Sequence, residues 1–204
     1  MKLYGLLVAG VNPNDEKVYI YSREYELSSF AFFNRNPIKG CFKFIGRETT
    51  PLLEKGTRHT AEHSSSEASF IVHIQVSYSS KLAYYAFCDS SYPKRVAFKC
   101  LNEFMEAFEA KHGDTWTKYI KDENLLCGLS VLLKDYADPT KKDVLTDAMK
   151  NADDIKSVLH MNITRLLEKQ GDLEKLVEKS KDLSDQGKLF LKSSRKMNKG
   201  WCCF

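Results

Sequence analysis

The sequence predicts an α+β domain followed by one long helical segment. Runs of residues that favour strands alternate with amphipathic helical runs over the first half of the chain. The composition changes after Pro139, where proline is absent, aromatic residues become scarce, and leucine, lysine and acidic residues dominate. In this second part apolar residues recur at alternating spacings of three and four, which is typical of a coiled-coil helix.

Five strands and two helices account for the first part. In chain order we expect strands over Lys2–Ala9 and Lys17–Tyr21, a helix over Glu26–Phe44, strands over Gly56–Ser64, Phe70–Tyr78 and Leu82–Cys88, and a helix from Tyr92 to about Lys111. The turn cluster at 12–15 predicts a hairpin between the first two strands. Ser28 or Ser29 can cap the first helix, and Pro37 is expected to interrupt or kink it. Gly113 is expected to end the second helix.

Charge and hydropathy exclude several classes of protein. A net charge of +4 is too small to indicate nucleic-acid binding. The apolar start, Met1–Gly10, is too short for a secretory signal. The longest later apolar run, Leu125–Leu133, has about half the length that a membrane-spanning helix needs. We therefore expect any membrane attachment to be peripheral or covalent.

No residue pattern typical of an enzyme, a cofactor site or a metal site is found. The sequence has no Walker loop, no G-x-S-x-G turn and no Cys/His nucleophile arrangement. His59 and His63 are four apart, which suits a metal ion only on a helix, whereas their Thr/Ser-rich surroundings predict a strand or loop. We expect no catalytic, cofactor-binding or metal-binding residues.

The six cysteines form two groups. Four of them lie among apolar neighbours without a C-x-x-C pair, and we expect buried free thiols rather than disulfides at Cys41, Cys88, Cys100 and Cys127. Cys202 and Cys203 are adjacent, lie near the end of the chain and follow a polar tail. Packing does not explain that pair.

A heptad register can be followed from residue 145 to residue 197, and eleven of its sixteen seam positions are apolar. This predicts a coiled-coil helix over 140–199, on the order of 80 Å long. The expected seam is Leu145, Ala148, Ala152, Ile155, Leu159, Asn162, Leu166, Lys169, Leu173, Leu176, Ser180, Leu183, Gly187, Phe190, Ser194 and Met197. Because the helix has a narrow apolar stripe and no second helix to cover it, we expect it to fold with a partner.

Lys169 interrupts the seam between Leu166 and Leu173. A cation at this position is costly to desolvate unless several acceptors surround it. Two interpretations remain open from the pattern alone. Lys169 either reaches solvent from a loosely packed coiled coil, or it forms a polar layer with acceptor side chains of partner helices and fixes their register.

Two parts of the chain resemble one known family. The segment V-L-H-M-N-I-T-R-L-L-E-K-Q-G-D-L-E-K-L-V-E-K-S-K-D-L at 158–183 resembles an R-type SNARE motif, and Asn162 and Phe190 fall where that motif has them. M-K-L-Y at the start, S-S-F-A-F-F-N-R at 28–35 and Y-P-K-R-V-A-F at 92–98 resemble a longin domain. The domain order and the terminal Cys-Cys resemble the lipid-anchored longin R-SNAREs.

The resemblance implies four regions: a profilin-like longin domain with a five-stranded antiparallel sheet over 1–125, a linker over 126–139, a SNARE coiled-coil motif over 140–199 and a lipid-anchor tail over 200–204. It implies vesicle fusion through a four-helix bundle with three Q-SNARE helices, and later separation by SNARE disassembly machinery. It implies a cytoplasmic protein that cycles to the cytosolic face of Golgi, endosomal, vesicle or vacuolar membranes. A non-fusogenic or inhibitory SNARE-like tether is the alternative function.

The resemblance also implies that the longin domain can hold the SNARE helix folded back. Phe42 and Phe44 on the first predicted helix are candidates for that contact, and the alternative is that both belong to the core of the domain. The sequence departs from the family at the central layer, where R-SNAREs carry arginine and this chain has Lys169. Lysine offers fewer donors, so we expect a weaker or differently matched layer, which the effect of Lys169→Arg on the melting of the assembled complex would measure.

The tail departs from the family as well. A C-a-a-X prenylation signal needs cysteine fourth from the end, where this sequence has Trp201. Either the protein continues beyond this sequence, or Cys202 and Cys203 are modified by palmitoylation or by prenylation of a Cys-Cys-X end. Two lipid chains, with basic residues and Trp201 beside them, would anchor the chain to anionic lipid.

Overall fold

The computed structural model describes residues 1–64, 69–142 and 158–199, with side chains described as far as Lys192. The strands are β1 (Leu3–Val11), β2 (Val18–Tyr25), β3 (Arg58–Ser64), β4 (Ser69–Val76), β5 (Leu82–Cys88) and β6 (Val158–Asn162). The α-helices are α1 (Phe32–Thr49), α2 (Lys94–His112), α3 (Leu129–Asp135), α5 (Ile163–Glu168), α6 (Leu173–Lys179) and α7 (Asp185–Lys199). Short 3-10 turns are η1 (Thr50–Leu52), η2 (Thr115–Lys118) and η3 (Pro139–Lys141).

One mixed sheet organises the fold, with strand order β2-β1-β5-β4-β3-β6. The first five strands pair antiparallel, as the resemblance to a longin domain implies. β6 pairs parallel to β3, from Arg58 opposite Val158 to Glu62 opposite Asn162. The expected five-stranded sheet is therefore wrong by one strand, because residues 158–162, assigned to the coiled coil, add to its open edge.

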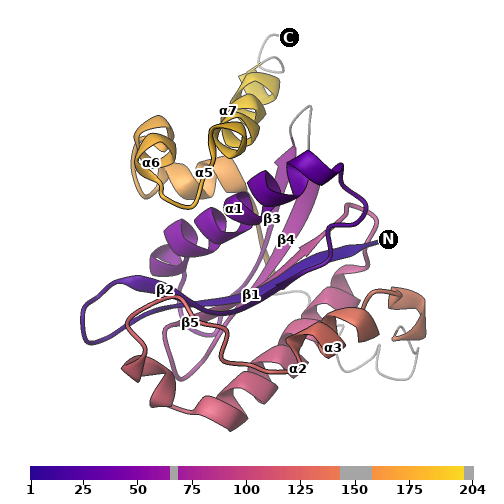
Figure 1. The fold of residues 1–204 in the computed structure, drawn as a ribbon, viewed down its shortest axis with the longest axis vertical. Helices are drawn as coiled ribbons and strands as arrows, with labels where there is room; N and C mark the ends of the chain where they lie inside the picture. Colours follow the sequence, from indigo (N-terminus) through magenta and orange to yellow (C-terminus); the bar gives the residue numbers. More distant parts are fainter. Residues whose placement is uncertain (65–68, 143–157, 200–204) are drawn as a thin grey trace.

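Helices cover both faces of the sheet (Figure 1). α1 lies on one face together with α5, α6 and α7, and α2 and α3 lie on the other. Alternation along β1 divides the core accordingly: Leu7 and Ala9 join the α1 side, and Leu6 and Val8 join the α2 side. Because β1 is covered on both faces, its sequence is apolar almost without interruption.

Both helices predicted for the first part are present, but their boundaries differ from the predicted ones. α1 begins at Phe32 with Ala31 as its N-cap, so neither Ser28 nor Ser29 caps it. The helix runs through Pro37 without ending. The carbonyl that Pro37 leaves without a donor belongs to Phe33, which is exposed, so water can satisfy it. α2 starts after Pro93 and stops at Gly113, whose φ of 46° suits glycine.

The predicted burial of the cysteines holds for three of the four positions. Cys41, Cys88 and Cys100 are buried free thiols, whereas Cys127 is exposed. The prediction for Cys127 is wrong because the residue precedes Gly128 in the loop that leads into α3, and only neighbours such as Leu126 and Leu129 turn into the core. α3 lies within residues 126–139, the region predicted to be a linker.

Candidate functional site

The described C-terminal segment, residues 158–199, lies across α1 and the β3 edge of the sheet (Figure 1). It is not the continuous helix that the heptad pattern predicts. β6 is a strand, and three separate helices follow it. Over residues 158–199 the expected helix is therefore replaced by four shorter elements. β6, α5 and α7 contact the domain that precedes them in the sequence, and α6 packs on α5 and α7.

Capping residues explain where the segment breaks. The Asn162 side chain accepts a hydrogen bond from the backbone N–H of Thr164 at 2.8 Å and so starts α5, and Asp172 starts α6 by accepting from Glu174 at 3.0 Å. Gly171 lies between these two helices with a φ of 152°. The Ser184 hydroxyl accepts from the N–H of Gly187 at the start of α7. These polar residues fit a long helix poorly and fit helix ends well.

The apolar side of the segment is buried against the domain. Two kinds of residue contribute: seam positions and positions outside the seam. After β6, the buried apolar residues of the described segment are Ile163, Leu166, Leu167, Leu173, Val177, Leu183, Phe190 and Leu191. All but Leu166 belong to the same core cluster as α1, and Leu176 packs partly against that cluster. Each such side chain contributes about 2 kcal/mol when fully buried, before the cost of ordering the segment.

The seam residues predicted from the heptad register differ in their exposure to solvent. Leu166, Leu173, Leu183 and Phe190 are buried, whereas Leu159 is 53% exposed on the edge strand and Lys169 is exposed at the end of α5. Asn162 is half-buried and acts as a cap. The predicted residues Leu145, Ala148, Ala152, Ile155, Cys202 and Cys203, and the side chain of Met197, lie outside the described residues.

α1 is shaped to receive the chain before α7. A Cβ atom at Gly40 would overlap the carbonyl oxygen of Asp182, so only glycine allows this approach. The Cys41 thiol donates to the carbonyl of Gly187 at 3.5 Å. Burial raises the pKa of that thiol to about 12, so it stays protonated. Gln186 adds a hydrogen bond of 2.8 Å from its side-chain amide to Asn34.

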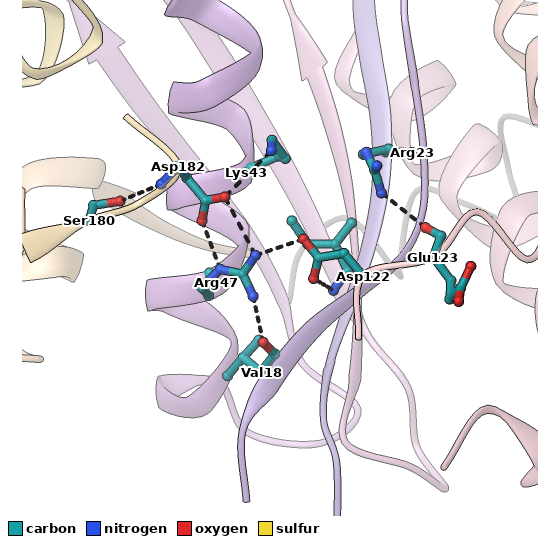
Figure 2. A network of polar contacts seen from close by, with 9 residues as sticks. Val18, Arg23, Lys43, Arg47, Asp122, Glu123, Ser180 and Asp182 are labelled. Atoms are coloured by element: carbon teal, nitrogen blue, oxygen red, sulfur yellow. Dashed lines mark hydrogen bonds and ion pairs between the residues drawn. The ribbon is translucent and has the colours of Figure 1, made fainter. Parts of the chain in front are cut away.

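Arg47 is the polar centre of this contact (Figure 2). Its Nε lies 2.7 Å from Oδ2 of Asp182, its Nη2 lies 2.8 Å from Oδ2 of Asp122, and its Nη1 donates to the carbonyl of Val18 at 2.6 Å. Lys43 adds a second cation 3.5 Å from Asp182. Burial disfavours the Arg47 charge, but the hydrogen bonds to both carboxylates outweigh it and raise the pKa of Arg47 above its ordinary value.

Asp122 extends this network to the opposite edge of the sheet. It accepts the N–H of Ile20 at 3.0 Å, and the following residues run along β2 through hydrogen bonds from Glu123 to Ile20 and from Leu125 to Tyr21. The end of the N-terminal domain and the C-terminal segment therefore share one guanidinium. The Arg47 cluster, defined as Arg47, Lys43, Asp122 and Asp182, connects three regions that are distant in the sequence.

Phe42 and Phe44 are both fully buried on α1. The Phe42 ring stacks on Phe87 at 3.9 Å and meets the edge of Phe70 at 5.1 Å, so its ring contacts lie within the sheet domain. Both residues belong to the cluster that includes the buried C-terminal side chains. Their role in holding the segment thus stays a prediction. Sequence reasoning missed Arg47 and Gly40, because a charge and a glycine on a helix give no signal until the partner segment is located.

Comparisons with known proteins identify both parts of the chain. The Longin family, described as a regulated-SNARE-like domain, matches residues 27–125, and the Synaptobrevin family matches residues 144–203. The "Putative synaptobrevin homolog YKT6" of Dictyostelium discoideum is 32% identical over the whole of this chain and 98% of its own length. The chain belongs to the YKT6-like longin R-SNAREs.

Two further relatives of this R-SNARE have the same extent. The "VAMP-like protein YKT61" of Arabidopsis thaliana and the "Synaptobrevin homolog YKT6" of Yarrowia lipolytica are each 30% identical over the whole chain and 98% of their own length. The R-SNARE therefore acts in vesicle trafficking with SNARE partners. Within the described residues, no helix of this R-SNARE is long and apolar enough to cross a bilayer.

Proposed function

We propose that this R-SNARE alternates between the docked arrangement, in which residues 158–191 pack on the longin domain, and a released one that joins three Q-SNARE helices in a four-helix bundle. One observation carries the proposal: three seam side chains, Leu173, Leu183 and Phe190, are buried in the core cluster that includes α1 of the longin domain. A side chain buried on α1 cannot at the same time fill a bundle core. Docking and assembly therefore exclude each other.

In the released state the seam of residues 145–197 forms one helix, with Lys169 at the central polar layer. Its exposure in the docked arrangement supports this role, because an exposed cation can move to a layer of acceptors without first leaving a buried site. Asn162 then exchanges its capping hydrogen bond for a seam position. The protein acts by assembly and not by catalysis.

The cysteines and basic residues near the C-terminal end support a peripheral attachment to membranes. Cys202 and Cys203 are the proposed lipid-bearing residues, and Lys192 with the basic residues after it would contact anionic lipid. The proposed location is the cytosolic face of Golgi, endosomal, vesicle or vacuolar membranes, with a cytoplasmic pool in the docked state. SNARE disassembly machinery would return the chain from the bundle to that pool. Mass spectrometry of the native protein checks the lipid.

The test of the proposal uses Gly40→Ala in the full chain. Alanine raises helix propensity in α1, so the longin domain itself should hold or gain stability. The added Cβ overlaps the carbonyl of Asp182, and such overpacking costs about 1–3 kcal/mol in the docked state only. We expect capture by a mixture of three Q-SNARE helices to become about five- to hundredfold faster.

Liposomes that carry the Q-SNAREs distinguish the two candidate functions. Faster fusion with Gly40→Ala supports the R-SNARE proposal. Faster assembly without fusion would instead support the inhibitory tether. An unchanged capture rate, in a variant whose longin domain remains folded, would show that docking does not limit assembly.

A further inference from the structure

Two histidines lie beneath the docked segment. Side chains alternate along β3, so His59, Ala61 and His63 share one face. Ala61 belongs to the core cluster of the α1 side, and the helices that pack on β3 on this side are α5 and α7. The opposite face of β3 is marked by Arg58, which lies over the ring of Phe98 in α2.

Both rings are buried, and among residues 1–64, 69–142 and 158–199 no charged group is in hydrogen-bonding contact with either of them. His59 is 5% exposed; its Nε2 lies 2.7 Å from the Thr57 hydroxyl, and its Nδ1 has no hydrogen-bond partner within the described residues. His63 is 3% exposed and stacks on the ring of Phe70 at 4.7 Å. A buried imidazolium in either place would lack the acceptors that its second N–H needs.

The charged groups around these rings do not favour protonation. Lys169 at the end of α5 opposes a charge on His59, and Glu54, after η1, favours it more weakly than burial disfavours it. The cross-strand neighbours Ile74 and Phe70 of β4 carry no charge, nor does Leu159 of β6. On α7 the described charged residues interact with each other or with α6, through Lys188 to Glu178 and Asp185 and through Lys192 to Glu178.

We propose that His59 and His63 make docking of the SNARE segment sensitive to pH, so that acid releases it. This inference rests on the proposed alternation between docked and released states. Release uncovers the β3 face, and water can then solvate a protonated ring. The docked arrangement holds both rings neutral, so protons bind to the released state in preference.

The sign of the effect follows from linkage. Burial, together with Lys169, lowers the pKa of His59, and burial lowers the pKa of His63 to about 4. A solvated histidine titrates near pH 6.5, so the released state binds more protons as the pH falls through about 6.5. Docking is at full strength above about pH 7.5. At pH 5.5 His63 should weaken docking about tenfold, and His59 acts in the same direction.

His73 serves as the control for the two histidines on the face that release uncovers. His73 packs on Phe98 of α2 at 5.3 Å, on the face of the sheet that release does not uncover, and burial lowers its pKa to about 3. His160 is exposed on β6, with Nε2 3.1 Å from Nζ of Lys94. Because His160 belongs to the docked segment and contacts Lys94 of the longin domain, it is not a neutral control. His73→Gln should leave the pH dependence of release almost unchanged, whereas the paired change His59→Gln with His63→Gln should remove the part that these two rings supply.

The experiment measures capture of the full chain by excess Q-SNARE helices at pH 7.5 and pH 5.5, with small-angle scattering of the free chain under both conditions. Relative to the double variant, wild-type capture should accelerate at least about tenfold on acidification, because His63 alone accounts for that factor and His59 adds to it. Equal pH dependence in wild type and double variant overturns the inference. A free chain already extended at pH 7.5 contradicts docking itself, whereas a chain compact at both values contradicts only the histidine proposal.

A direct titration covers the case in which the double variant fails to fold. Ring proton resonances of the wild-type histidines should show His63 neutral down to about pH 5 while the chain is docked, and His59 titrating below the ordinary histidine pKa. In Gly40→Ala, where release is favoured, both should titrate nearer pH 6.5. Ordinary titration of both rings in the docked wild-type chain would overturn the inference.

Discussion

Arg47 joins three regions of the chain with one side chain, as Figure 2 shows. Among the contacts of Arg47, the one with Asp182 joins residues that are farthest apart in the sequence, by 135 positions. Asp182 is 11% exposed, so its carboxylate interacts in a weakly screened environment where a hydrogen bond between charged groups is worth about 1.5–3 kcal/mol. Loss of Arg47 would leave both Asp182 and Asp122 without their strongest cation, and Lys43 would compensate only for Asp182.

Arg47→Gln is expected to shift the docked arrangement toward release by about 2 kcal/mol, or about thirtyfold. Capture by Q-SNARE helices in low salt measures this shift. Arg35→Gln is the matched control on the same helix, because Arg35 donates to the carbonyls of Phe30 and Ser28 within the longin domain. Equal effects of the two substitutions would contradict the role of the Arg47 cluster.

At the scale of elements, one sequence encodes two arrangements of the same segment. The heptad spacing of leucines predicts a continuous helix, and the short polar residues and Gly171 provide the stops that divide it into β6, α5, α6 and α7. Propensity alone leaves these alternatives close in free energy. Burial of side chains against α1 and pairing of β6 with β3 stabilise the divided form when no partner helices are present.

Gly171→Ala tests this balance. Alanine favours the continuous helix by about 1 kcal/mol and is strained at the φ of 152° found between α5 and α6. We expect about five- to tenfold faster capture by Q-SNARE helices. Gly113→Ala is the control, because its φ of 46° lies at the end of α2, away from the docked segment. That variant should lower the melting temperature without accelerating capture.

The sequence predicts the longin strands well, because alternation in β4 and the apolar runs in β1 and β5 reflect burial within the first part of the chain. It does not predict β6. Val158–Asn162 forms a strand only because β3 offers an unpaired edge 100 residues earlier, from Arg58 opposite Val158 onward. Gly40 and Arg47 escape prediction for the same reason: their importance depends on a segment that is distant in sequence.

At the scale of the whole molecule, the longin domain takes the place of the missing partner helices. It covers seam leucines with α1, pairs a strand with β3 and neutralises Asp182 with Arg47. These three sets of contacts hold successive parts of the same segment, so we expect the segment to be released cooperatively. Such cooperativity would keep the apolar seam away from wrong partners until Q-SNARE helices are present.

Amide hydrogen exchange of the free, full-length chain at pH 7.5 tests the docked arrangement most directly. The hydrogen-bonded amides of β6 and of α5 to α7 should be protected, and Gly40→Ala should reduce this protection while β1 and β5 stay protected. Exchange of residues 158–191 at the rate of an unfolded chain, beside a protected longin sheet, would contradict the account.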